Sequence, residues 1–467
     1  MYNLCLFPIG SFLIFFVTGC VSYQTKPLVP IAIFSDVDYT RQKKSSFEAQ
    51  ALTFSKAALL MNKNNPELDE VRANYETFQS IANIKTPWPN PSLDLGPDLG
   101  SKLGPGAVDK TQPFIGLGFT IPLGGKMMRN DDLNIAQAMR SFVEVQAKHR
   151  ELYLELRGAY TRFYLAFRKQ EIQDDLVSSS KAILKLTKSL MKAGASTALD
   201  LGMIELDTQK VELEALDLNN EREEILSMLS ILLGLDASRF KQMRPSSIPD
   251  LNQPLPGHKN LKTILIKNHL ELARLRYDYE VAEKNLRLQI SKQYPDIQFG
   301  ADREREVGEK TVIMGLRLGI KIPVFDRNRQ GIAQATKERE HIRKQYVTIA
   351  HEALSHLKKS YESIKLHQKK YYLLNKDIQK RAKMNLKIAK QSLESGGIDT
   401  LKYLDVLRTY QQTMKDIALV ESDVRLAWLD LEKVLGYPLI KYPGESKFNI
   451  TLDPQAKSVL KENSNEK

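Results

Sequence analysis

The chain has 467 residues, of which 42% are hydrophobic and 27% charged, and its formal net charge at pH 7 is +12. This length could hold two or three ordinary domains, and many charges with few aromatic residues are typical of long, solvated helices. The lysines and arginines are spread along the predicted helices rather than clustered, which argues against a nucleic-acid-binding protein. The cysteines are Cys5 and Cys20, so the sequence beyond them has neither a disulfide framework nor a cysteine-based metal site.

The first twenty residues have the pattern of an export signal. Residues 4–17 are an apolar run too short to span a bilayer, and the run leads into Val17-Thr18-Gly19-Cys20. This ending resembles the bacterial lipoprotein signal, in which the cysteine is lipidated and becomes the first residue of the mature protein. The resemblance implies that residues 1–19 are removed, that Cys20 carries a lipid anchor and that Ser22 directs sorting to the outer membrane. An ordinary signal peptide with a chance cysteine is the alternative.

The next part of the chain predicts a lead-in, a helix and two strands. Residues 20–46 contain prolines and charges with little periodicity, which indicates an extended segment. Residues 47–82 are helical in pattern, with a break and restart at Asn65-Pro66. Residues 92–100 and 113–123 alternate apolar with small or polar residues, which is the period of a strand.

A long helical hairpin follows. Residues 128–191 carry apolar positions in alternating steps of three and four, the 3.5 period of a coiled coil. At ~1.5 Å per residue this helix is on the order of 95 Å long, too long for one globular domain. The break at Gly194-Ala195-Ser196-Thr197 turns the chain, and a second helix of the same period returns to Leu233-Gly234. His149 lies on the apolar seam and is expected to be a packed, neutral histidine.

The second half repeats this order after a Pro-rich linker at 246–258. Its elements are a helix at 261–292, strands at 297–302 and 311–323, a helix at 330–393, a break at Gly396-Gly397 and a return helix ending at Leu435-Gly436. Ile135-Ala-Gln-Ala138 recurs as Ile332-Ala-Gln-Ala335. The chain is therefore a duplicated unit, with repeats at 47–245 and 259–436. Residues 437–467 are polar and lysine-rich, and are expected to be a partly disordered tail.

Four strands of about ten residues have the length of outer-membrane barrel strands. They cannot close a barrel alone, and an open sheet edge in lipid leaves unpaired backbone groups that cost several kcal/mol each, by order of magnitude. Either the strands lie outside a membrane, or several chains pool them. Arg317 and Lys321 occupy the polar positions of the last strand, and are expected to face a barrel lumen or to be solvated wall residues without a selective role.

The order of these elements resembles the TolC-type outer-membrane efflux channel family over nearly all of residues 47–436. The matching motifs are Asn65-Pro66-Glu67-Leu68, Pro91, Tyr294-Pro295-Asp296, the strand ends Ile121-Pro122-Leu123-Gly124 and Ile322-Pro323-Val324-Phe325-Asp326, the Ile-Ala-Gln-Ala helix starts and the two Leu-Gly helix ends. Gly124-Gly125-Lys126 and residues 326–331 most resemble the subfamily that serves heavy-metal cation pumps.

This resemblance implies a mainly α fold with a small β part. Long antiparallel helical hairpins form a periplasmic α-barrel, and four strands per chain contribute to a shared, trimeric, 12-stranded outer-membrane β-barrel. The implied partners are two further copies of the chain, a periplasmic adaptor, an inner-membrane pump and outer-membrane lipid, with no nucleic acid. The family implies no enzymatic activity, no cofactor and no metal site of its own.

The resemblance also implies two functional regions. The hairpin tips would contact the adaptor through Gly194, Ala195, Ser196, Gly396 and Gly397. The closed aperture would involve Asp405, which matches an acidic ring position of the family, with Lys402 at the preceding position and Asp200 at the equivalent place in the first repeat. A solvated residue near a turn is the alternative for Asp405.

Other patterns are set aside. His351 and His356 are five residues apart, not the four that a zinc-binding helix requires. Residues 104–111 are similar to a phosphate-binding loop, but Asp109 stands where that loop needs glycine. The functions left open are an efflux duct for small solutes such as metal cations or drugs, the exit duct of a type I protein secretion system, and a lipid-anchored periplasmic coiled-coil scaffold without a pore.

Overall fold

The computed structural model describes residues 23–43, 51–100, 110–194, 196–241, 243–251, 253–305 and 312–445. It divides into two compact units, Met1–Phe47 and Glu48–Lys467. The described part of the first unit contains helix α2 (Pro30–Lys43), so the prediction of an extended lead-in was wrong there. Pro30 supplies the backbone angle of a first helical turn, and no later glycine or proline interrupts the segment.

The second unit begins with two helices, α3 (Phe54–Asn64) and α4 (Pro66–Ala82). In the range described from residue 51, the helix that was predicted from residue 47 starts at Phe54, because Thr53 caps it and the short strand β1 (Ala51–Leu52) precedes it, paired in parallel with β4 (Arg244–Pro245). The predicted break is confirmed at Asn65. Its side chain accepts a hydrogen bond from Leu68 N and donates one to the carbonyl of Leu232, both at 3.0 Å.

The four predicted barrel strands form one antiparallel sheet in the order β2-β3-β5-β6. The strands are β2 (Ser92–Gly100), β3 (Lys110–Ile121), β5 (Ile297–Arg305) and β6 (Val312–Ile320). The central pairing joins the two repeats, with Phe119 opposite Phe299. Within the chain, β2 pairs only with β3 and β6 only with β5 among the described residues, so both edges of the sheet carry unpaired backbone groups.

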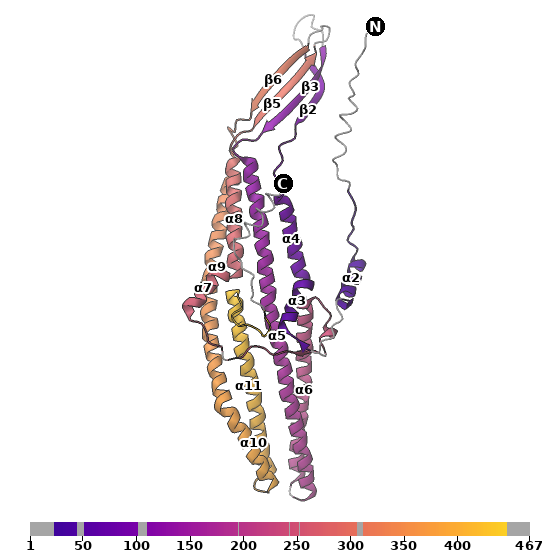
Figure 1. Ribbon diagram of the computed structural model, residues 1–467, viewed down its shortest axis with the longest axis vertical. Helices are drawn as coiled ribbons and strands as arrows, with labels where there is room; N and C mark the ends of the chain where they lie inside the picture. The colour runs from indigo at the N-terminus through magenta and orange to yellow at the C-terminus, as the bar shows by residue number, and fades with distance from the viewer. Residues whose placement is uncertain are drawn as a thin grey trace. The chain divides into compact units, whose positions relative to one another are not determined.

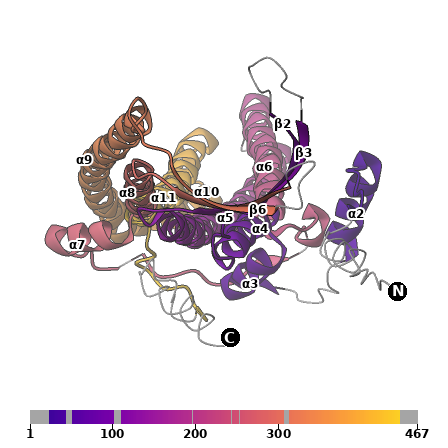
Figure 2. The ribbon, with the colours of Figure 1, turned by 90° about the horizontal axis from the view of Figure 1, so that it is seen from above.

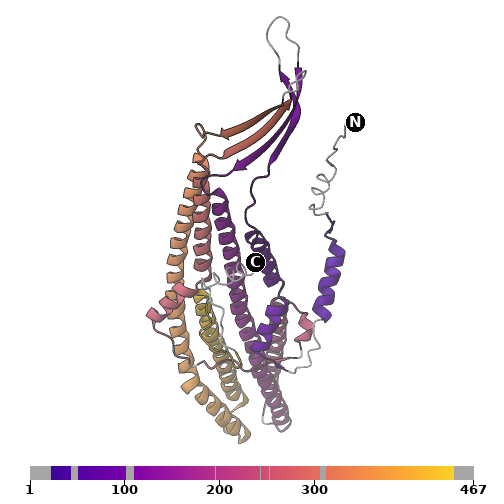
Figure 3. The same ribbon diagram turned by 45° about the horizontal axis from the view of Figure 1, so that its top comes forward.

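Each repeat contributes one long helical hairpin. The first consists of α5 (Lys126–Lys192) and α6 (Ala198–Leu233). In the second, α9 (Arg329–Leu373), the π-helical segment η2 (Leu374–Ile378) and α10 (Gln379–Glu394) lead out, and α11 (Thr400–Leu435) returns. The prediction of one regular outgoing helix was therefore wrong at η2. Within this unit the sheet lies at one end of the helices and both hairpin turns at the other (Figures 1 and 3).

The helix predicted at 261–292 is two helices, α7 (His258–Asn268) and α8 (Leu270–Ser291). His269 separates them and caps the second, since its Nδ1 accepts a hydrogen bond from Leu272 N at 3.3 Å. A short 3₁₀ turn, η1 (Ala237–Arg239), follows the first hairpin. No helix in the described ranges is both long enough and apolar enough to cross a membrane.

Helix α5 is the centre of the packing. It contacts α4, α6, α8 and α11, and viewed along the helices it lies between α8 and α4 (Figure 2). Its predicted seam is buried at its middle, where Leu152, Leu156 and Ala159 are inaccessible to solvent. Near the hairpin turns, Ile183 and Ile204 of the first hairpin share a hydrophobic cluster with Leu393 and Leu404 of the second. The two hairpins thus pack against each other through the contact of α5 with α11 and through the cluster near their turns.

Residues 437–445, called here the C-terminal strap, also pack onto the helices. Arg157 of α5 forms a bidentate ion pair with Glu432 of α11, at 2.9 and 3.0 Å, and a further pair with Glu445 at 3.2 Å. Ser55 Oγ donates to the carbonyl of Gly444 at 2.7 Å. Of the tail that was predicted to be partly disordered, residues 437–445 are therefore ordered, because these buried charges and hydrogen bonds hold them in place.

Candidate functional site

The four-stranded sheet has one apolar face. Directly opposite residues of paired strands lie on the same face, so the register gathers the apolar positions of all four strands together. They include Leu93, Leu95, Ile115, Leu117, Phe119, Phe299, Ala301, Met314, Leu316, Leu318 and Ile320, and the same face also carries Arg303, which lies opposite Ile115 and Met314. These side chains are exposed in the single chain, and Leu316 is 91% exposed. Such a face needs a cover, and its size and continuity fit lipid or a partner protein.

The opposite face is mostly polar or small, although Phe114 also lies on it. It gathers Asp94, Gly116, Gly118, Thr120, Gln298, Gly300, Asp302, Gly315, Arg317 and Gly319. A sheet with one largely apolar face and one mostly polar, glycine-rich face is the pattern of a barrel wall, with lipid outside and water inside.

Arg317 lies on the polar face, as the alternation predicted. Its Nε is 3.0 Å from Asp302 Oδ1, and its guanidinium lies 5.2 Å from the ring centroid of Phe114. The side chain remains mostly exposed, so the ion pair fixes the direction of the cation without removing it from water. Lys321 follows the end of β6 and is exposed. Their role in a barrel lumen stays a prediction.

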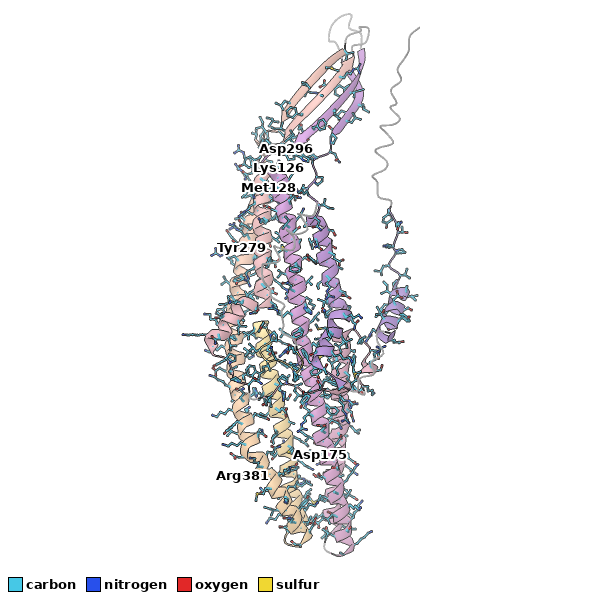
Figure 4. The ribbon with its side chains drawn as sticks, in the orientation of Figure 1. Lys126, Met128, Asp175, Tyr279, Asp296 and Arg381 are labelled. Atoms are coloured by element: carbon cyan, nitrogen blue, oxygen red, sulfur yellow. The ribbon has the colours of Figure 1, made fainter. Side chains whose placement is uncertain are left out.

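The sheet is fixed to the helices by an ion pair at their junction. Lys126, the first residue of α5, lies 2.6 Å from Asp296, which immediately precedes β5 (Figure 4). The pair joins the start of the first long helix to the strand of the other repeat. It therefore fixes where the sheet begins relative to both hairpins.

The predicted hairpin tips are turns with glycine in the left-handed region. Gly194 has φ 73° and Gly396 has φ 74°, a conformation that other residues adopt only with strain. Ser196 Oγ is 3.5 Å from Thr400 Oγ1, so the structure brings the two tips together. The Gly397 N–H donates to the carbonyl of Ser392 at 2.7 Å. Ala195 and Cys20 lie outside the described residues.

The predicted aperture residues lie just beyond these turns. The carboxylate of Asp200 accepts hydrogen bonds from Thr197 N at 2.9 Å and from Ser196 Oγ at 3.3 Å, which completes a capping box at the start of α6. Hydrogen bonds to Thr197 lower the pKa of Asp200. Lys402 and Asp405 are exposed on α11. Among the described residues no ion pair joins the three side chains, and their part in an aperture stays a prediction.

Two ion pairs that the sequence analysis missed link the return helices of the hairpins. Arg408 Nε of α11 lies 2.9 Å from Asp207 Oδ1 of α6, and Lys415 Nζ lies 2.6 Å from Glu214 Oε2. The carboxylate of Asp207 is largely buried, with 11% of its side chain exposed. Both pairs join residues 201 positions apart, which is nearly the distance in sequence between equivalent residues of the two repeats. Opposite charges at that separation were the feature of the sequence that could have predicted these pairs.

The histidine patterns carry no metal site in the described part of the chain, where no cluster of potential metal ligands occurs. His351 and His356 are exposed on α9. His149 is partly buried, and burial together with the charges of Arg72 and Arg150 lowers its pKa, which favours the predicted neutral form. Most of the loop at 104–111 lies outside the described residues.

Comparison with known proteins shows to which family this arrangement of helices and strands belongs. The model of the family described as "Outer membrane efflux protein" matches residues 60–235 and 263–437, once in each repeat. A curated relative, the cobalt-zinc-cadmium resistance protein CzcC of Cupriavidus metallidurans, is 20% identical over 246 residues. That match spans 52% of this chain and 58% of the relative.

Solved structures share the fold. The outer-membrane channel OprN has a TM-score of 0.69 at 16% identity, covering 89% of this chain and 98% of OprN. The outer membrane protein VceC of Vibrio cholerae has a TM-score of 0.67 at 14% identity, covering 83% and 97%. The duplicated hairpins, the two-faced sheet and the doubled family match lead to one conclusion: this chain belongs to the outer membrane efflux protein family, whose members are channels of the outer membrane that extend into the periplasm.

Proposed function

We propose that three copies of this chain form the exit duct of a tripartite efflux system. The observation that carries the proposal is the sheet, which has one largely apolar face and two edge strands, β2 and β6, whose outer edges have no partner among the described residues. Backbone groups at a sheet edge cannot stay unpaired in a bilayer. Pairing β2 of one copy with β6 of the next satisfies both edges, and three copies of four strands give a closed barrel of 4 × 3 = 12 strands.

In that barrel the polar face lines a water-filled lumen, with Arg317 and Asp302 on its wall. The hairpins continue the conduit through the periplasm, and the tips at Gly194 and Gly396 meet a periplasmic adaptor that connects to an inner-membrane pump. The chain supplies a passive path, and the pump supplies the energy. The ion pair between Arg408 and Asp207 holds the two hairpins of each copy side by side near the tips.

The likeness to CzcC, whose name refers to cobalt, zinc and cadmium resistance, favours divalent metal cations as the solutes. Efflux of drugs and export of protein by a type I system are the alternatives. Loss of the chain should sensitise cells to these metals if the proposal is right. A deletion strain tested against a panel of metals, dyes and antibiotics separates the three cases.

Cysteine crosslinking tests the barrel. A variant with one cysteine on β2 (Leu95→Cys) and one on β6 (Leu316→Cys or Leu318→Cys) should form disulfide-linked trimers in membranes. Cysteines on the central strands, Leu117→Cys with Ala301→Cys, are the matched control and should give no links between chains. Purified protein in planar bilayers should also conduct ions. A non-conducting protein without crosslinks between edge strands is the result expected of a scaffold.

Two further variants test the ends of the duct. Cys20→Ser should abolish lipid labelling and weaken anchoring while the trimer remains, and unchanged labelling would count against the anchor. Valine at both Gly396 and Gly397 should weaken docking of the adaptor, because valine cannot relax into the left-handed turn at Gly396. Normal adaptor crosslinking in that double variant would argue against docking at the tips.

A further inference from the structure

The polar face of the sheet carries two aspartates at one level. Directly opposite residues of all four strands form a row, called here the aspartate row, which consists of Asp94, Gly116, Asp302 and Gly315. Each aspartate thus alternates with a glycine. Neighbouring strands are ~4.8 Å apart, so the two aspartates of one chain are roughly 10 Å apart across the sheet. In the proposed barrel, three such rows surround the lumen.

Asp302 is held beside a cation. Its Oδ1 atom lies 3.0 Å from Arg317 Nε, and its side chain is 12% exposed against 63% for the arginine. Gly315 makes room for the carboxylate, because a Cβ added there would lie 2.6 Å from Asp302 Oδ2. The absence of a side chain at position 315 therefore lets Asp302 lie against the wall of the sheet and reach Arg317, which follows on the same strand, β6.

Phe114 contacts the same arginine. The Cζ atom of Arg317 is 5.2 Å from the ring centroid of Phe114, which is within the range of a cation–π interaction. The ring lies over Gly116, where an added Cβ would be 2.9 Å from Phe114 Cζ. Since β5 separates β3 from β6, the two side chains meet over the strand between them. The guanidinium is therefore held along the wall of the sheet, beside one carboxylate and one aromatic ring.

Asp94 differs from Asp302, because it is exposed and has no ion pair with another described side chain. Within the strands, the described side chains of the polar face that carry charge are Asp94, Asp302 and Arg317. Their sum is one net negative charge per chain (−2 + 1 = −1). Lys321 lies beyond the end of β6, ~20 Å along the chain from the aspartate row. That distance is about two Debye lengths at 0.1 M salt, so its charge acts at a different level of the sheet.

We propose that Asp302 determines the ion preference of the barrel lumen by cancelling the charge of Arg317, which leaves the carboxylate of Asp94 to favour cations. The inference rests on the proposed function, since it takes the polar face to line a water-filled lumen. Without Asp302, three uncompensated guanidinium groups would oppose the three Asp94 carboxylates of the trimer. The wall would then no longer favour the divalent metal cations proposed as solutes.

Reversal potentials in planar bilayers test this assignment. The purified full-length trimer separates two KCl solutions of different concentration, both about 0.1 M or below, where the Debye length is ~10 Å or longer. The reversal potential gives the ratio of K⁺ to Cl⁻ permeability. The variants are Asp302→Asn, Asp94→Asn, Arg317→Gln and the double variant Asp302→Asn/Arg317→Gln. Arg303→Gln, which removes the same charge from the opposite, largely apolar face, is the matched control.

We expect the parent channel to favour K⁺. Asp302→Asn and Asp94→Asn should each lower the permeability ratio by about fivefold, because three charges change around the lumen and act in opposite senses on K⁺ and Cl⁻ from roughly 10 Å through water, about one Debye length. Arg317→Gln should raise the ratio by a similar factor. The double variant should match the parent, and Arg303→Gln should have no effect.

A parent that favours Cl⁻, or an Asp302→Asn channel with an unchanged ratio, refutes the assignment. If Asp302→Asn is poorly folded, the exposed position of Asp94 decides, and an unchanged ratio in Asp94→Asn refutes it equally. A double variant as far from the parent as Asp302→Asn would show that Arg317 is not the charge that Asp302 cancels. If Arg303→Gln shifts the ratio and Arg317→Gln does not, or if the parent does not conduct, the polar face does not line a pore, and the proposed function fails instead.

Discussion

Replacing Arg157 by methionine should release the C-terminal strap. Arg157 and Glu432 have side chains that are each 1% exposed, and Glu445 is 7% exposed. The guanidinium also lies 4.4 Å from the ring centroid of Tyr442. Burial alone would lower the pKa of Arg157, but the carboxylates of Glu432 and Glu445 outweigh it and raise that pKa. The arginine therefore stays charged and compensates two buried carboxylates.

The expected magnitude follows from leaving those carboxylates without their cation. Removing one partner of a buried ion pair costs about 3–5 kcal/mol. Glu432 keeps hydrogen bonds from Leu439 N at 2.8 Å and Ile440 N at 2.9 Å, which moderates the loss and favours the lower end. At 1.4 kcal/mol per factor of ten, about 3 kcal/mol raises the population of released strap roughly 100-fold.

Limited proteolysis measures this population. Lys441 is exposed within the strap, and trypsin can cleave after it only when the strap leaves the surface. When reclosing is faster than cleavage, the cleavage rate follows the equilibrium for opening. Mass spectrometry of the released C-terminal peptides separates this site from other lysines. Arg168→Met on the same helix, where the arginine side chain is 54% exposed, is the matched control and should leave the rate unchanged.

A second variant makes the reasoning refutable even if Arg157→Met is poorly folded. Glutamine at position 432 removes one uncompensated buried charge and keeps an acceptor for the N–H groups of Leu439 and Ile440, so Arg157→Met/Glu432→Gln should move the cleavage rate part of the way back toward that of the parent. If Arg157→Met is cleaved within about twofold of the parent, a difference below 0.5 kcal/mol, the ion pair does not hold the strap. A double variant that opens more readily than Arg157→Met would refute the charge argument.

Three other predictions concern different parts of the chain. Gly234→Ala should lower the thermal midpoint by several degrees, because its Cβ would lie 2.1 Å from the carbonyl oxygen of Asn64 and φ is 62°; Gly257→Ala, with open space around it, should not. His149 has a pKa below the usual 6.5 in the folded chain, so its stabilising contribution is present above pH 6.5 and is lost as pH falls through the folded pKa. Thermal unfolding followed by circular dichroism should therefore show a smaller loss between pH 7.5 and 5.5 in His149→Gln than in the parent. Arg408→Gln should raise single-channel conductance by loosening the hairpins near the tips, and equal conductance would mean that the α6–α11 ion pair does not restrain the opening.

The parts of the fold that the sequence predicted are those with a local, repeated period. The alternation at Ile115–Ile121 can be satisfied only by a strand with one apolar face, and the steps of three and four through Leu152 and Leu156 only by a packed helix. The turns were predictable for the same local reason, since Gly194 and Gly396 lie where each helical period stops. Duplication strengthened every one of these predictions by presenting it twice.

The parts that were missed depend on residues distant in the sequence. Arg157 looked like an ordinary charged position on a long helix, because its partners Glu432 and Glu445 lie 275 and 288 residues away. The order of the strap could not be predicted for the same reason, since its composition is polar and its stability comes from Arg157. The π-helical segment at Leu374–Ile378 contains no proline or glycine, and the local sequence gives no signal for it.

The links between the two hairpins support a ring without reference to any relative. The repeats are offset by 202 residues, from Gly234 to Gly436 (436 − 234). Ser196–Thr400, Asp207–Arg408 and Glu214–Lys415 join residues 204, 201 and 201 positions apart. Each differs from the offset by at most two residues, which is about 3 Å along a helix, so equivalent residues of the two repeats lie at nearly the same height. Repeats related by rotation with almost no rise close into rings, whereas a rise would give an open helical array. In the proposed trimer, the second hairpin would then meet the first hairpin of another copy at the same height, as a closed tunnel requires.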